Sequence, residues 1–176
     1  MLDQINSLIH EGQINKKELL NLLKHTAKGI TIADFMECNL RIREDAKCIH
    51  TSYKKDLIES YTVFMLRIKD VKEDNSNFNE ELDASELIEA VNILLEQERS
   101  VQEFEFGTAF WKIYKILSIY STFIREEPIH QVGMMFPGGF TVKKVGNKYT
   151  CPVKENNKDN YLAVCPFCIA EQDETV

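Results

Sequence analysis

Helix-breaking residues are concentrated at one end of this chain. All four prolines and four of the seven glycines lie after residue 127, together with three of the five cysteines. Proline lacks the N–H that a helix interior needs, and glycine weakens helices through its backbone entropy. We therefore place an architectural boundary at Glu127/Pro128, between a helical bundle at 1–127 and a tail at 128–176.

The body carries helical periodicity over most of its length. Apolar residues recur at three- and four-residue steps in about five segments. A residue suited to N-capping starts each segment: Asn15, Thr31, Ser52, Asp83 and Thr108. We expect the last helix to continue until Pro128, and the acidic, Asn-rich stretch 73–82 to be a solvated loop. The predicted fold class is mainly α, a bundle with a small C-terminal β-hairpin segment.

Charge and apolar pattern exclude several classes of protein. The net charge is −7, whereas general nucleic-acid or anionic-membrane binders need an excess of Lys and Arg. The apolar stretch 106–124 has Lys112 and Lys115 near its middle, each costing about 3 kcal/mol in a bilayer, so it predicts a core helix. The N-terminal residues 1–17 lack the apolar core of a signal peptide. Five cysteines are an odd number, so we expect free thiols and a cytoplasmic location.

The tail has little helical pattern. Residues 140–145 and 148–153 flank Gly146-Asn147, which is typical of a β-hairpin with a two-residue connection. Turn-forming and polar residues make up most of the remainder. A segment of 49 residues (128–176) with so little core pattern needs something else to hold it together.

Three cysteines and a histidine in the tail meet that need. Cys165 and Cys168 form a C-x-x-C pair, whose thiolates can reach one tetrahedral metal from a tight turn. Cys151 supplies a third sulfur and His130 an imidazole. Three thiolates and one imidazole make a closed structural zinc site. We therefore predict zinc as the cofactor, bound by His130, Cys151, Cys165 and Cys168.

Two other types of site use the same residues. Three thiolates and a histidine can also hold an iron–sulfur cluster, which would make the chain a redox protein. The sequence Cys-Pro-Phe-Cys is similar to the redox pair of glutaredoxins, but that pair must open a helix of a βαβ unit. Only eight residues follow Cys168, so we expect no such unit.

We expect the other cysteine, histidine and charged residues to have structural roles. We expect Cys38 and Cys48 to be buried thiols, and the histidines of the body to lie on the surface: His10, His25 and His50. The charged run at Arg43, Glu44 and Asp45 is typical of a solvated helix face with weak ion pairs. Glu127-x-x-His130 contains Pro128, which breaks the helix that a di-iron ligand pair would need.

Several motifs resemble an uncharacterised archaeal family found mainly in methanogens. They are Phe110–Tyr114, Glu127–His130, Phe136–Gly139, Tyr149–Lys154 and Cys165–Ala170, with Arg43–Ala46 in the body. The family is known as domain of unknown function 2115, or uncharacterised protein family 0305. After the histidine its pattern has Pro-Val-Gly, whereas this chain has Gln131-Val132-Gly133. The resemblance implies an archaeal cytoplasmic protein without an established activity.

The functional hypothesis is a non-enzymatic, zinc-stabilised protein that binds a protein partner. A closed site leaves zinc no open position for catalysis, and the sequence contains no catalytic motif. The acidic balance favours a protein over nucleic acid as partner, and we expect no membrane association. The alternative is a redox protein or enzyme that uses an iron–sulfur cluster or an open metal site at the same residues.

Overall fold

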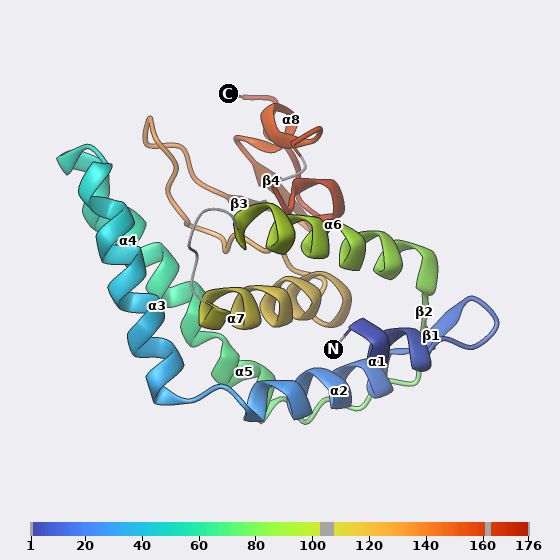
Figure 1. Cartoon of the computed structure of the whole chain (residues 1–176). Coiled ribbons are helices and arrows are strands. Elements are labelled where there is room, and N and C mark those ends of the chain that lie inside the picture. Colours follow the sequence, from blue (N-terminus) through green and yellow to red (C-terminus); the bar gives the residue numbers. More distant parts are fainter. Residues whose placement is uncertain (1, 103–107, 161–162, 176) are drawn as a thin grey trace.

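A helix that is buried on nearly all sides lies at the centre of the fold. It is α7 (Thr108–Ile119), in which Ile113, Ile116 and Leu117 are fully buried. The computed structural model describes residues 2–102, 108–160 and 163–175. In Figure 1, α6 (Ala84–Gln102) covers one side of α7, and α2 (Lys16–Lys28) and α5 (Ile68–Glu73) cover the other. The stretch that the sequence predicted to be a core helix is therefore in the core.

The other elements are short or lie at the edges of this core. They are α1 (Leu2–Ser7), α3 (Ile32–Asp45), η1 (Ala46–Cys48), α4 (Thr51–Leu66), α8 (Lys154–Asn157) and η3 (Cys165–Phe167). The strands are β1 (Gln13–Asn15), β2 (Glu81–Asp83), β3 (Lys143–Val145), β4 (Lys148–Cys151) and β5 (Glu171–Gln172). The described residues thus form a mainly helical protein with two small sheets. The predicted mainly α class is confirmed.

Three of the predicted helix starts, at Asn15, Thr31 and Asp83, show the expected capping chemistry. The prediction at Ser52 was wrong by two residues, because His50 is the N-cap of α4 and accepts from the N–H of Ser52. The side chain of Asn15 accepts hydrogen bonds from the N–H groups of Lys17 and Glu18 at the start of α2. Thr31 and Asp34 form a reciprocal capping box at the start of α3, which satisfies N–H groups that have no partner within the helix. Asp83 accepts from the N–H of Ser85. Gly107, expected just before α7, lies outside the described residues.

The predicted number of helices was too small, because tertiary contacts divide and add elements. The third predicted helix ends at Leu66, and α5 begins after Arg67, whose buried side chain donates to Ser121 and Glu127. The expected loop at 73–82 reaches into β2, which pairs antiparallel with β1. Neither α1 nor this sheet was expected, since each depends on partners distant in sequence.

The central helix does not run on to Pro128 as the sequence suggested. It changes to a π-helix, η2 (Tyr120–Ile124), in which the N–H of Arg125 donates to the carbonyl of Tyr120 at 3.0 Å. Glu126 then adopts a positive φ of 51°, a left-handed conformation that ends a helix. The helix therefore ends before the proline, which is buried where the chain turns into the tail.

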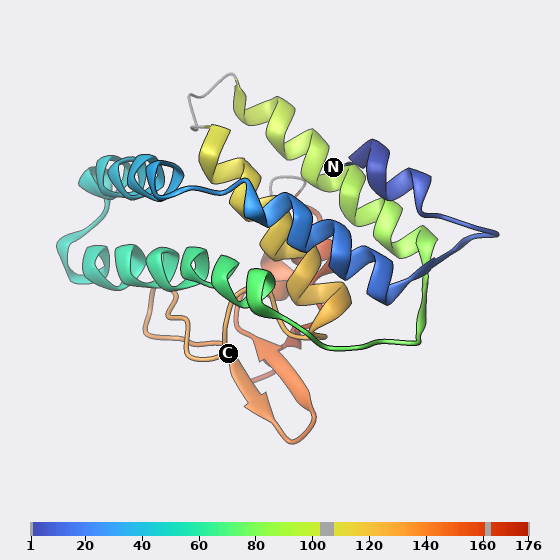
Figure 2. The same ribbon diagram turned by 90° about the horizontal axis from the view of Figure 1, so that it is seen from below.

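The tail packs across α6 and α7 through a few apolar side chains. Ile129 and Val164 belong to the main core, and Phe167 packs against it. Figure 2 shows the hairpin of β3 and β4 projecting beyond the helices. Its two-residue connection is the predicted one, with Val145 paired to Lys148. The strands are shorter than expected because Thr141 bridges back to Met135 rather than extending β3.

The last strand closes the tail onto itself. β5 runs parallel to β4, with Cys151 opposite Gln172. Asp173 follows at once and accepts hydrogen bonds from Lys143 and Thr175. A second, small cluster of buried side chains forms beneath this sheet from Val142, Cys151 and Ala170. Within the described ranges, no helix combines the length and the apolar character needed to cross a bilayer.

Candidate metal centre in the C-terminal segment

The C-x-x-C pair lies on a tight turn that directs both cysteines to one side of the tail. η3 begins at Cys165 and carries Pro166 in its first turn. The N–H of Cys168 donates to the carbonyls of Val164 and Cys165, at 3.1 and 3.3 Å. Lys154 then fixes this turn from outside, since its ammonium donates to the carbonyls of both cysteines.

Cys151 enters the same region from the end of β4. Its side chain is 4% exposed, and Asp173 donates its N–H to the Cys151 carbonyl at 3.0 Å. Burial raises the pKa of the Cys151 thiol, while the N–H groups of Val153 and Lys154 hydrogen-bond to it and lower the pKa in part. Backbone N–H groups directed at a sulfur favour the thiolate, which is the form that binds metals.

The three cysteines lie close enough for their charges to influence one another. Burial raises the pKa of Cys165 to about 11, and the charges of Cys151 and Cys168 raise it further. Cys168 packs against the small cluster that contains Cys151. The buried phenol of Tyr114 on α7 has its pKa raised by burial, by Tyr61 and by Cys165 and Cys168. Cys168 packs against both the main core and the small cluster, so it lies between body and tail.

His130 lies beside this region on the segment that enters the tail. Its ring packs edge-on against Phe136, with ring centroids 5.4 Å apart, and Phe136 in turn packs against the cluster that contains Cys151. Burial lowers the pKa of His130 to about 4. The imidazole is therefore neutral at pH 7, which is the form that ligates metals.

The four residues are not arranged as a finished coordination sphere. In the described part of the chain, no three or more His, Cys, Asp or Glu side chains form a group placed to hold a metal ion. The donor set is nevertheless chemically suited to zinc, because thiolate and neutral imidazole are its common protein ligands. The nearby N–H groups and Lys154 also provide positive partners for thiolates.

The remaining sequence predictions for cysteine, histidine and charged residues have mixed outcomes. Cys38 is buried as expected, but Cys48 is exposed because η1 turns it away from the core. The three histidines of the body are on the surface. Arg43 and Glu44 are exposed on α3, as expected of a solvated face, and Glu44 pairs with Lys47 at 2.5 Å.

Sequence reasoning missed the role of Lys154. A signal was present in the repeated Cys-Pro dipeptide, since Cys151-Pro152-Val153-Lys154 has the same layout as Cys165-Pro166-Phe167-Cys168. In the first copy a lysine stands where the second has its cysteine. The lysine of the first turn binds the carbonyls of the second, so the two turns are built as a pair.

These features define a class of protein: a helical body whose C-terminal segment is closed over it by two cysteine-bearing turns. Residues 15–173 match the model of a family described as an uncharacterized protein conserved in archaea (DUF2115). The chain belongs to this family.

Several of the relatives are methanogen proteins that the chain matches over nearly their whole length. A UPF0305 protein of Methanothermobacter thermautotrophicus is 38% identical, over 93% of this chain and 99% of the relative. A UPF0305 protein of Methanocaldococcus jannaschii is 31% identical, over 88% of this chain and 94% of the relative. One from Methanococcus maripaludis is 27% identical, over 90% and 97%. No solved structure matches the chain.

Proposed function

We propose that this protein is a non-enzymatic binding protein whose C-terminal segment is held by one zinc ion. The observation that supports it is that Cys168 packs against the buried cluster containing Cys151, while Cys165 lies three residues earlier on the same turn. Among the described residues, the segment's own cluster has three buried members, and small segments with so little core commonly rely on a metal. His130 is the proposed fourth ligand.

Zinc would supply a cross-link rather than a reaction. It would join the end of β4 to the turn at η3, and it would hold the thiols as thiolates. Metal binding would then contribute directly to folding free energy. Lys154 would keep the carbonyls of Cys165 and Cys168 hydrogen-bonded.

Metal content and thermal melting test this proposal on protein purified anaerobically. We expect one zinc per chain in the wild type, none in Cys165→Ser, and full occupancy in the control Cys48→Ser, whose thiol is exposed. Chelation should lower the melting temperature of the wild type and of Cys48→Ser. A wild type without metal, or one whose melting is unaffected by chelation, would contradict the proposal.

Metal analysis and the variant His130→Ala distinguish the closed zinc site from an iron–sulfur cluster and from an open metal site. If the protein contains iron and sulfide and shows a broad visible absorption band, the bound group is an iron–sulfur cluster and the chain is a redox protein. A His130→Ala variant that keeps both zinc and stability would show an open coordination position instead of a closed one. A His130→Ala variant that loses zinc supports the four-ligand site.

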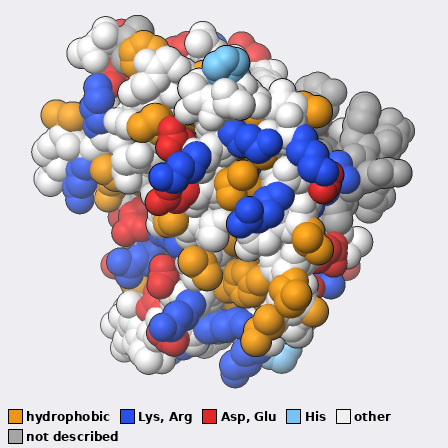
Figure 3. All heavy atoms as spheres, turned by 90° about the vertical axis from the view of Figure 1, so that its left-hand side faces the viewer, with side chains coloured by type: hydrophobic (Ala, Val, Ile, Leu, Met, Phe, Trp, Pro, Cys, Tyr) orange, Lys and Arg blue, Asp and Glu red, His pale blue; other side chains and the backbone are white. Residues whose placement is uncertain are grey.

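We propose that the protein partner binds on α3, where a row of large apolar side chains faces solvent. Ile32, Met36 and Leu40 are 79%, 63% and 66% exposed and lie four residues apart. Figure 3 shows hydrophobic side chains standing among charged ones on this side of the molecule. A row with this spacing is the ridge that an amphipathic helix accommodates in its groove. The proposed partner element is therefore an amphipathic helix.

A matched pair of variants tests this surface. A partner that binds the purified wild type should bind Met36→Lys/Leu40→Lys at least tenfold more weakly. The control is Val145→Lys, an equally exposed apolar position (63%) on the hairpin, which should bind as the wild type does. Equal loss in both variants would contradict a surface on α3.

A further inference from the structure

A cavity of about 450 Å³ lies where the C-terminal segment passes the end of α4. Its walls come from Arg67 at the end of α4, from residues of the segment 127–132, and from Lys144 and Tyr149 on the hairpin. Its volume falls within the range of small-molecule sites. The local sequence pattern did not indicate the cavity, because these three segments are distant from one another in the chain.

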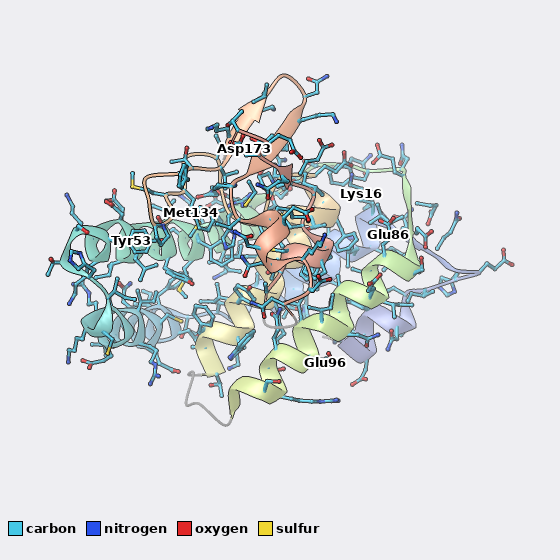
Figure 4. The ribbon with its side chains drawn as sticks, turned by 90° about the horizontal axis from the view of Figure 1, so that it is seen from above. Lys16, Tyr53, Glu86, Glu96, Met134 and Asp173 are labelled. Atoms are coloured by element: carbon cyan, nitrogen blue, oxygen red, sulfur yellow. The ribbon has the colours of Figure 1, made fainter. Side chains whose placement is uncertain are left out.

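The segment that forms one wall is held against α4 at two points. Arg67 donates to the carboxylate of Glu127 at 2.7 Å, and the hydroxyl of Tyr53 donates to the carbonyl of Met135 at 3.0 Å. Figure 4 shows Tyr53 and Met134 on the same side of the molecule, where this segment lies along α4. Hydrogen bonds therefore anchor the wall on both sides of the residues that line the cavity.

Arg67 supplies a buried positive charge to the cavity. The residue is 7% exposed, and its two terminal nitrogens donate to Ser121 at 3.0 Å and to Glu127 at 2.7 Å. Its Nε–H has no hydrogen-bond partner among the described residues, and the Nε atom keeps accessible surface. Because a charged donor without a partner costs free energy when it is largely buried, this N–H favours an acceptor supplied from the cavity.

Positive charge is in excess around the cavity. The carboxylate of Glu127 is shared between Arg67, at 2.7 Å, and Arg125, at 3.6 Å, so one negative charge faces two positive ones. The ammonium of Lys144 lies 5.1 Å from the centre of the Tyr149 ring and forms no ion pair with a described residue. Among the described residues, no acid besides Glu127 lines the cavity. The cavity therefore suits an anion.

The remaining walls require more than a simple anion. Pro128, Val132 and the ring of Tyr149 line the cavity beside the charged groups, and the space is larger than a carboxylate or phosphate group fills. Proline and tyrosine rings pack well against a planar aromatic body. Arginine N–H groups match a carboxylate in geometry, whereas a phosphate monoester would bring nearly two negative charges close to Glu127. The walls thus favour a carboxylate joined to an aromatic ring.

We propose that this cavity binds a small aromatic monocarboxylate. The carboxylate accepts a hydrogen bond from the Nε–H of Arg67 and is attracted by the ammonium of Lys144. The aromatic ring packs against Pro128 and Tyr149. None of these residues is a proposed zinc ligand or lies on α3, so the cavity is a binding site beyond the proposed function.

Calorimetric titration of the full-length protein with phenylacetate, at an ionic strength of about 0.15 M, tests the proposal. We expect saturable binding that is at least tenfold tighter than that of phenylacetamide, which has the same shape without the charge. Lys144→Gln should weaken phenylacetate binding at least fivefold. The matched control is Lys148→Gln on the same hairpin, whose ammonium pairs with Glu171 at 2.9 Å, and it should stay within twofold of the wild type.

Filling the cavity provides an independent check. Val132 is 51% exposed, so Val132→Trp should abolish phenylacetate binding without changing the melting temperature. Val145→Trp, at a position on the hairpin that is 63% exposed, should bind as the wild type does. The proposal is overturned if phenylacetate does not bind, if Val132→Trp binds it normally, or if the two lysine variants lose affinity equally. Phenylacetamide or inorganic phosphate binding as tightly as phenylacetate would overturn it too.

Discussion

At the scale of single residues, the buried lysine of α2 is the least expected feature. Lys16 is 2% exposed and contacts Glu126 at 2.6 Å and Glu80 at 3.1 Å. Burial alone would lower its pKa, but the hydrogen bonds that the ammonium donates to Glu126 and Glu80, together with their charges, outweigh burial and raise the pKa. Its ammonium also lies 4.7 Å from the centre of the Phe78 ring. One residue therefore ties α2 to the segment before β2 and to the end of the central helix.

Removing only the two carboxylates should lower the free energy of unfolding more than removing the carboxylates and the Lys16 ammonium together. Glu80→Gln/Glu126→Gln leaves a buried ammonium without a charged partner, and we expect the free energy of unfolding to fall by about 1–3 kcal/mol. Adding Lys16→Met to that variant should recover part of the loss, because no buried charge remains. Urea denaturation measures both. The control pair Glu11→Gln/Glu18→Gln is exposed and should change little; a triple variant no more stable than the double one would contradict the argument.

At the scale of elements, the C-terminal strand depends on one carboxylate. Asp173 donates its N–H to Cys151, and its side chain accepts from Lys143 at 2.8 Å and from Thr175. These bonds hold β5 beside β4, although β5 has only two residues. The side-chain hydrogen bonds from Lys143 and Thr175 keep the pKa of Asp173 at about 2.

This lowered pKa predicts an acid-sensitive tail. An aspartate is ordinarily half-protonated near pH 3.8, so the unfolded chain takes up its proton before the folded one does. The contribution of Asp173 is therefore complete above about pH 4 and is lost as the pH falls towards about 2. Hydrogen exchange at the N–H of Asp173, which donates to the Cys151 carbonyl, should accelerate relative to its intrinsic rate over this range in the wild type.

A matched substitution isolates that effect. Asp173→Asn should show fast exchange already at pH 6 and little further change on acidification. Glu174→Gln, at the exposed neighbouring position, should behave as the wild type does. Identical exchange in all three proteins would show that β5 is held by something other than this carboxylate.

Only some features of the central helix could be predicted from the local sequence. Capping residues and apolar periodicity predicted its start and its burial, because both act within a few residues. The change to a π-helix at Tyr120 and the early end at Ile124 were not predictable, since they accompany contacts such as the bond from Arg67 to Ser121 at 3.0 Å. Arg67 is 54 residues away in sequence.

At the scale of the whole molecule, α7 is the element against which the others pack. Ile113 is 0% exposed at its centre, whereas Ile32 on α3 is 79% exposed. The same substitution at the two positions should therefore have very different effects. We expect Ile113→Ala to lower the free energy of unfolding by about 2–5 kcal/mol.

Ile32→Ala provides the comparison, with an expected change of about 0.5 kcal/mol or less. Chemical denaturation followed by the fluorescence of Trp111, which lies on α7, measures both. Similar losses in the two variants would mean that the α3 surface is covered by a second copy of the chain, and would be accompanied by concentration-dependent stability.

The sequence by itself determined the helical body, the helix starts at Asn15, Thr31 and Asp83, the two-residue hairpin connection and the set of cysteines in the tail. These follow from propensities and spacings that operate over a few residues. Only the tertiary structure decided the buried Lys16 ion pairs, the pairing of β1 with β2 and the π-helix. Each of these joins groups from segments distant in the chain, so its free energy depends on packing that no local pattern contains.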